Sequence, residues 1–166
     1  MALALACGCH AVSPRSPRAV SLTLPLASQS GTGNGALACA GILLAYHGSS
    51  LDAEAEVRFP AERLADVTPL EIRDYLRGHG FAAEVVRASR PGIEDLLEHG
   101  YPVLLPLDQG TFVLAYGLRG SRLSVEDPAS GPREMDLSRV EGRLMLAVVP
   151  RGLVLSAAPR ASRARR

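Results

Sequence analysis

An apolar segment that directly follows a glycine-rich polar loop constrains the fold of this chain more than any other feature. Residues 29–48 read QSGTGNGALACAGILLAYHG. From about residue 35 to residue 47 the segment is apolar all round at helical spacing, which predicts a helix that is buried on most sides. It is far shorter than the roughly 20 residues that span a bilayer, so we interpret it as a core helix. Its first turn offers free N–H groups and the positive end of the peptide dipoles, which stabilise a thiolate, a phosphate or an oxyanion.

The glycines of this loop also suggest a phosphate-binding loop. Gly31, Gly33 and Gly35 are closely spaced, but the Lys of the G-x-x-x-x-G-K-[ST] pattern is missing and no strong strand abuts the loop. We therefore expect no nucleotide site and no cofactor.

Helical patterns fill the first part of the chain and strand patterns the second. The segment Thr68-Pro69-Leu70-Glu71 is a capping box with proline at the first helical position, and it predicts a helix that stops at Gly78. Further helices are expected at residues 51–58, with Ser50 as the cap, and at residues 91–98. Strands are expected at residues 20–24, 81–86, 103–107, 111–118, 123–126 and 144–149. This order indicates an α+β domain in which N-terminal helices pack on a C-terminal antiparallel sheet.

Length and charge restrict the organisation of the chain and its partners. A chain of 166 residues suffices for one ordinary domain. We expect this domain at residues 19–150, between a leader or linker at residues 1–18 and a basic, disordered tail at residues 151–166. The net charge of +1 argues against a nucleic-acid binder, which would carry a basic domain or stripe.

Two cysteines in the first segment leave more than one interpretation open. Cys7 and Cys9 each follow a small residue, as does the lipid-bearing Cys at the end of a bacterial lipoprotein signal. The apolar run before them is too short for a secretory core, which a start codon assigned too far downstream would explain. With His10 they resemble part of a metal site, but zinc sites usually need four ligands and no second pair follows. We expect no metal, and membrane association only through a lipid anchor; a cell-envelope and a cytoplasmic location both stay open.

The loop and the apolar helix follow the spacing of one peptidase family. Gln29 is followed after five residues by Gly35, then by Ala38, and the helix closes with Tyr46 and Gly48. This pattern resembles the active-site segment of the bacteriocin-processing cysteine peptidases, which are papain-like domains that cut leader peptides after a double glycine and often precede peptide-exporting ABC transporters. The resemblance places Gln29 at the oxyanion hole and Gly35 at the position of the nucleophilic Cys.

Two downstream segments extend the resemblance to about residues 20–149. The catalytic His of the family begins a strand of the type H-F-V-V, and residues 111–114 of this chain read TFVL. The third catalytic residue of the family is the Asp of an Asp-Pro pair after the next strand, which corresponds to Asp127-Pro128. The resemblance therefore implies a papain-like fold with Thr111 at the position of the base. Asp127 has a structural interpretation as well, because an Asp before Pro commonly begins a turn.

Two of the three catalytic positions depart from the family pattern. A thiol attacks as a thiolate, and acyl transfer also needs a general acid. Gly35 has no side chain, and Thr111 cannot exchange a proton near neutral pH. We therefore predict a catalytically degenerate domain that acts as a peptide-binding or interaction module through Gln29, Asn34, Gly35 and Thr111. By resemblance, its partner is a peptide or protein segment such as a leader peptide or an exporter.

Two alternatives to this hypothesis remain. Cys39 lies one turn beyond Gly35, about 6 Å along the helix axis, so an active cysteine peptidase could use it. A free Cys is more commonly a small buried hydrophobe. His47, His79 and His99 lie at helix ends, where capping or surface positions are expected. The second alternative is a lipid-anchored envelope protein whose domain is a scaffold.

Overall fold

The computed structural model describes residues 19–25, 35–52, 55, 58–60, 66–107 and 111–151. The helical elements of this part are α1 (Gly35–Tyr46), α3 (Pro69–Gly78), α4 (Arg90–Glu98) and the 3-10 turn η3 (Leu137–Arg139). Its strands are β1 (Val20–Ser21), β2 (Phe81–Arg87), β3 (Val103–Pro106), β4 (Phe112–Arg119), β5 (Arg122–Asp127), β6 (Gly131–Asp136) and β7 (Leu144–Pro150). Helices precede most of the strands, as the sequence predicts.

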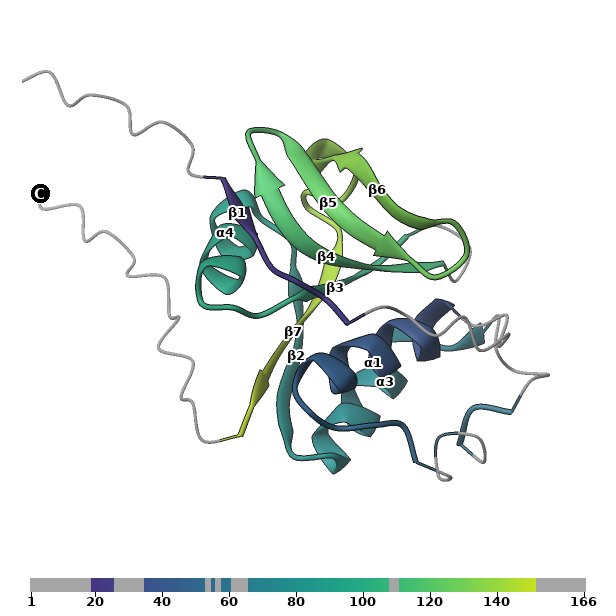
Figure 1. Cartoon of the computed structure of the whole chain (residues 1–166). Coiled ribbons are helices and arrows are strands. Elements are labelled where there is room, and N and C mark those ends of the chain that lie inside the picture. Colours follow the sequence, from purple (N-terminus) through teal and green to yellow (C-terminus); the bar gives the residue numbers. More distant parts are fainter. Residues whose placement is uncertain are drawn as a thin grey trace, which may run out of the picture.

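The strands form one antiparallel sheet in the order β2-β7-β3-β4-β5-β6. The short strand β1 pairs with the second half of β4, beyond the part of β4 that pairs with β3. Figure 1 shows the chain running from this strand toward α1. The first described segment of the chain is thereby held beside β4.

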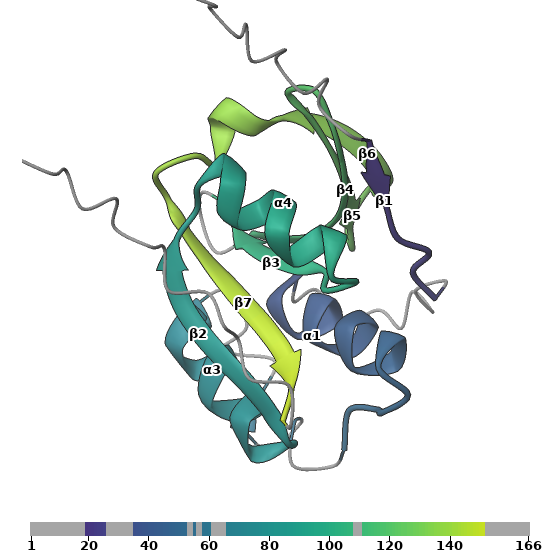
Figure 2. The ribbon, with the colours of Figure 1, turned by 90° about the vertical axis from the view of Figure 1, so that its left-hand side faces the viewer.

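Two hydrophobic clusters lie on opposite faces of the sheet. The first unites α1 and α3 with Leu104, Phe112, Leu114, Leu146 and Val148. The second unites α4 with the alternate residues of the same strands and with the curled β5 and β6. Figure 2 shows α4 across the sheet from α3. Because successive side chains of a strand point to opposite faces, each strand contributes to both clusters.

The helix α1 is the centre of the first cluster. Seven of its twelve residues are buried, among them Cys39, Leu43 and Leu44. At its end, the hydroxyl of Tyr46 donates a hydrogen bond of 3.0 Å to the carbonyl of Gly100. His47 packs between the rings of Tyr46, Phe81 and Tyr101, and burial lowers its pKa. The prediction of a buried core helix is confirmed, while His47 is half-buried among aromatic rings.

The helix caps follow from local sequence. Thr68 and Glu71 form both hydrogen bonds of the predicted capping box, and Ser89 caps α4. The helix expected at residues 51–58 lies partly outside the described residues. In its described part, Asp52 and not Ser50 accepts the capping bond from the backbone of Ala55, at 3.1 Å.

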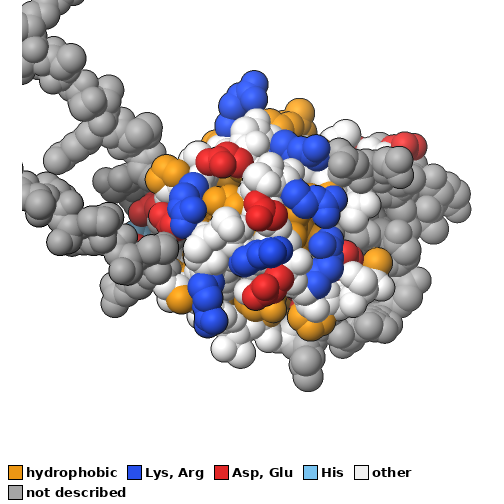
Figure 3. All heavy atoms as spheres, turned by 90° about the horizontal axis from the view of Figure 1, so that it is seen from above, with side chains coloured by type: hydrophobic (Ala, Val, Ile, Leu, Met, Phe, Trp, Pro, Cys, Tyr) orange, Lys and Arg blue, Asp and Glu red, His pale blue; other side chains and the backbone are white. Residues whose placement is uncertain are grey.

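The strand β6 is absent from the sequence prediction. Half of its residues GPREMD are charged, the segment follows a turn, and only Met135 among them is buried. This strand exists because its backbone pairs with β5 along the whole length of both strands. Figure 3 shows the face of the molecule seen from above in Figure 1, where acidic and basic side chains are interspersed and no continuous basic stripe is visible among the described residues.

Candidate functional site

The first turn of α1 abuts the start of β4. A Cβ atom added at Gly35 would lie 3.3 Å from the backbone N of Phe112 and 3.5 Å from its carbonyl O. Thr111 directly precedes Phe112 and is exposed, and its carbonyl accepts a hydrogen bond of 2.7 Å from the backbone N of Leu107. The fold therefore brings together the two positions, 35 and 111, that the sequence comparison assigned to the nucleophile and the base.

Asp127 ends β5 and is 7% exposed. Its carboxylate accepts hydrogen bonds from the backbone N of Ala129, at 3.0 Å, and from Nε of Arg133, at 3.1 Å. Its carbonyl closes the turn by accepting from the N–H of Ser130, and Gly131 follows with a φ of 81°. Asp127 thus has the turn-forming role that its position before Pro128 suggests, and Arg133 is its charged partner.

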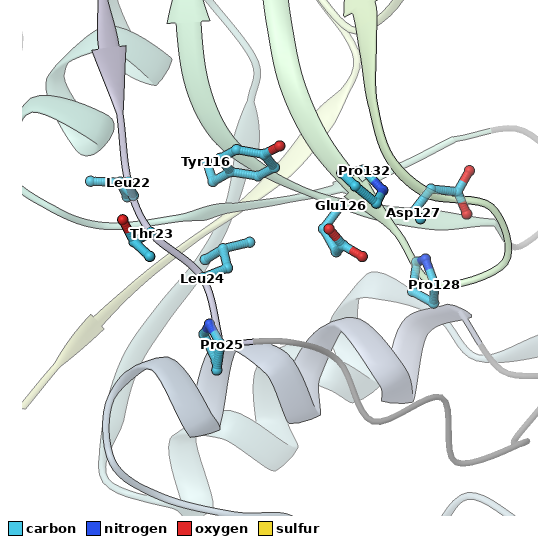
Figure 4. Close-up of a pocket in the computed structure, with 10 residues that line it drawn as sticks. Leu22, Thr23, Leu24, Pro25, Tyr116, Glu126, Asp127, Pro128 and Pro132 are labelled. Atoms are coloured by element: carbon cyan, nitrogen blue, oxygen red, sulfur yellow. The ribbon is translucent and has the colours of Figure 1, made fainter.

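Hydrogen bonds keep the carboxylate of Asp127 ionised. Burial raises its pKa, but the hydrogen bonds from Ala129, Ser130 and Arg133 outweigh burial and hold the pKa below the ordinary Asp value. In Figure 4 this carboxylate points away from Leu24 and Glu126. Its negative charge is therefore directed at the β5–β6 turn.

Removing this charge gives a prediction for the pH dependence of stability. Because the pKa of Asp127 is lower in the folded chain than the ordinary value of about 3.9, its contribution is complete above that pH and is lost as the pH falls toward the folded pKa. We expect Asp127→Asn to lower the free energy of unfolding by about 1 to 3 kcal/mol at pH 7, and by less below pH 4. Urea denaturation at both pH values measures this. The exposed ion pair of Asp74 with Arg73 supplies the control, since Asp74→Asn should change stability by about 0.5 kcal/mol or less at either pH.

Cys39 is enclosed by the fold. It lies one helical turn after Gly35 on the same side of α1, and it is 0% exposed. Burial raises the pKa of its thiol well above the ordinary value, and the charges of Asp127 and Glu126 raise it further. A thiol that stays protonated and buried is a poor nucleophile, so this geometry disfavours the alternative in which Cys39 performs catalysis.

Other predicted residues lie elsewhere. Gln29, Asn34, Cys7 and Cys9 lie outside the described residues, so the predicted oxyanion, binding and lipidation positions stay predictions. His79 and His99 are the C-cap residues of α3 and α4, as expected. No group of three or more His, Cys, Asp or Glu suited to a metal occurs among the described residues. In the same part of the chain, no helix has the length and apolar character that a membrane span requires.

A pocket of about 420 Å³ opens beside this site, between residues 22–25, which follow β1, and the β4–β5 pair. It is lined by Leu22, Thr23, Leu24, Pro25, Tyr116, Glu126, Asp127, Pro128, Gly131 and Pro132 (Figure 4). Sequence reasoning did not single out Tyr116, Glu126 or Arg133. The alternation of β5 is the sequence signal that points to Glu126. Successive side chains of a strand point to opposite faces, so Leu123, Val125 and Asp127 are buried on one face and Glu126 belongs to the other, less buried face.

The sequence profile of the Peptidase C39 family matches residues 23–145, which is most of the chain and includes both the start of α1 and the Asp127 turn. This chain belongs to the Peptidase C39 family. Comparison with curated protein sequences gave no significant match. The predicted family relationship is therefore confirmed by the profile of the whole domain.

Solved structures show the same fold. A double glycine motif protease from an AMS/PCAT transporter, in complex with its leader peptide, is 20% identical with a TM-score of 0.58, and the match covers 81% of this chain and 96% of the protease. The peptidase domain of Streptococcus ComA, a bi-functional ABC transporter involved in quorum sensing, is 15% identical with a TM-score of 0.55 over 79% of this chain and 97% of that domain. The C39-like domain of a toxin secretion ATP-binding protein from Vibrio parahaemolyticus is 18% identical with a TM-score of 0.50 over 70% of this chain and 97% of that domain. The papain-like C39 fold predicted from the sequence is confirmed.

Proposed function

We propose that this C39 domain binds a peptide without cutting it, and that it does so in connection with peptide export. The observation that carries the proposal is the absence of a side chain at Gly35, where the start of α1 meets the start of β4. The neighbouring Thr111 offers a hydroxyl in place of an imidazole. Without a thiolate and a base, covalent catalysis loses both the attacking group and the proton donor.

Three further observations support binding in place of cleavage. The elements that carry the three positions assigned by the family resemblance, namely α1, β4 and the end of β5, are all present. A C39 protease of similar fold was crystallised with a leader peptide, and another similar structure is the peptidase domain of the ABC transporter ComA. The remaining described thiol, that of Cys39, is buried and protonated. A peptide or protein segment, such as a leader peptide or part of an exporter, is the proposed partner.

Titration of the full chain with a synthetic peptide that ends in double glycine tests the proposal. We expect chemical-shift changes that saturate at micromolar to millimolar peptide, with the peptide mass unchanged after prolonged incubation. A peptide in which both glycines are replaced by valine should bind at least about tenfold more weakly. Gly35 lies close against the backbone of Phe112, and we expect this place to leave no room for the valine side chains. No detectable binding at millimolar peptide would remove the proposed function.

A pair of matched variants locates the binding site. Gly35→Val adds a branched side chain where even a Cβ lies 3.3 Å from the backbone N of Phe112, and it should weaken binding at least about tenfold. Gly78→Val places the same side chain in a helix where nothing lies within 4 Å of the added Cβ, and it should leave binding unchanged. Equal effects of the two variants would place the peptide elsewhere on the domain.

A further inference from the structure

The pocket beside the site combines apolar walls with a carboxylate that has no partner among the described residues. Leu22, Leu24 and Pro25 form one wall, and Pro128 and Pro132 contribute to the other. In Figure 4, Leu24, Tyr116 and Glu126 surround an open space, and the carboxylate of Glu126 points into it. A volume of about 420 Å³ is within the range of small-ligand sites, roughly 300 to 1,000 Å³.

An irregularity in β4 lies at this pocket. The register between β4 and β5 shifts between Ala115 and Gly117, so that Tyr116 is the extra residue of a bulge. A Cβ atom at Gly117 would lie 3.0 Å from the carbonyl O of Val20, so the glycine permits the close approach of β1. The backbone N of Leu22 then donates a hydrogen bond of 2.7 Å to the carbonyl of Tyr116. The chain continues from there as the apolar wall of the pocket.

The charges around the pocket leave Glu126 uncompensated. The neighbouring Asp127 is paired with Arg133, whereas the carboxylate of Glu126 has no hydrogen bond or ion pair to any residue that the structure describes. Burial and the charge of Asp127 raise the pKa of Glu126. Burial, followed by the charges of Glu126 and Glu134, also raises the pKa of Tyr116, so its hydroxyl stays neutral and adds no further negative charge to the pocket. A half-buried carboxylate without a partner is costly, and a bound cation would relieve that cost.

We propose that this pocket binds the ammonium or guanidinium group of a basic peptide side chain, so that the domain selects peptides carrying Lys or Arg near the double glycine. Lys and Arg side chains bury their methylene stems along apolar surface while the charged end pairs with an acid, which matches the walls and Glu126. The Tyr116 ring offers a second favourable surface for a cation. Asp127 and Pro128 line the pocket and belong to the turn beside the predicted site, so a peptide bound at Gly35 has the pocket next to it. This inference rests on the proposed peptide-binding function.

Two peptides that differ at one position test the proposal on the full chain. One carries a double glycine flanked by Lys, and the other has norleucine, a neutral residue of similar shape, in place of Lys. We expect the Lys peptide to bind about tenfold more tightly at pH 7 and low salt. In Glu126→Gln the two peptides should bind alike. This variant should remain folded, because it removes a charge that no described group compensates.

The controls separate the possible results. Glu141→Gln removes the same charge from an exposed turn and should preserve the preference for Lys. Equal binding of the two peptides to the wild-type chain would overturn the cation pocket while leaving peptide binding intact. No binding of either peptide would overturn the proposed function instead. If n-butylammonium ion alone binds as tightly as the Lys peptide, the pocket is a site for free amines and the assignment to a peptide is wrong.

Discussion

Peptide cleavage is expected to be absent from the wild-type chain and to appear in the double variant Gly35→Cys/Thr111→His. The double variant places a thiol at the start of α1, where the helix N-terminus lowers its pKa, and an imidazole at the start of β4. Asp127 already carries a negative charge at the end of β5. General acid–base catalysis contributes about 10² to 10⁴ to a rate, so the double variant should cleave at least about 100-fold faster than either single variant. Release of the fragments of a double-glycine peptide, followed by mass spectrometry, measures this.

The single variants are the matched controls for this prediction. Gly35→Cys lacks a base and Thr111→His lacks a nucleophile, so each should remain at the wild-type level. The new Cβ at position 35 requires Phe112 to shift by a few tenths of an ångström, and retention of the native circular dichroism spectrum checks that the fold tolerates this. Cleavage by the wild-type chain that disappears in Cys39→Ser would show that the nucleophile was assigned to the wrong position.

Cys39 is expected to react with iodoacetamide at least about 10³-fold more slowly in the folded chain than in 6 M urea. Its thiol is 0% exposed and its pKa is raised, so reaction has to wait for an opening of the fold. Open states of an ordinary domain have populations of about 10⁻³ or less. The measurement uses the background Cys7→Ser/Cys9→Ser, in which Cys39 is the only thiol of the chain.

A thiol on the exposed side of the same helix provides the comparison. Ala45 is an exposed residue of α1, and Ala45→Cys in a background without the three native cysteines should react as quickly as an unfolded thiol. Rapid and selective labelling of Cys39 at neutral pH in the folded chain would restore the active cysteine peptidase as the better hypothesis.

Elements that depend only on residues a few positions apart in the sequence were predictable. The capping box of Thr68 and Glu71 lies within a single turn of chain, and it starts α3 as predicted. The continuous apolar pattern of α1 requires burial in any fold, and the turn at Asp127-Pro128 is a local hydrogen-bonded structure. The strand β6 was missed because its polar residues show no pattern, and its pairing with β5 provides the reason for its conformation.

The candidate site was predictable only in part. The spacing of motifs assigned positions 35 and 111 to one site, and the structure places Gly35 against the backbone of Phe112. The role of Glu126 was not predictable, because its lack of a partner depends on the bulge at Tyr116 and on the close approach of β1 at Gly117. The same holds for the pairing of Asp127 with Arg133, which joins two strands.

The sequence by itself determined the family and the capping box that begins α3, and it is the source of our proposal that a glycine and a hydroxyl stand at the positions of the nucleophile and the base. Only the tertiary structure decided that Asp127 pairs with Arg133 and that Glu126 lines an open pocket, whereas the burial of Cys39 was already expected from the apolar helix. The physical reason is the range of the interactions. Caps and periodicity depend on residues a few positions apart, whereas burial and the compensation of charge depend on segments that meet only when the sheet has formed.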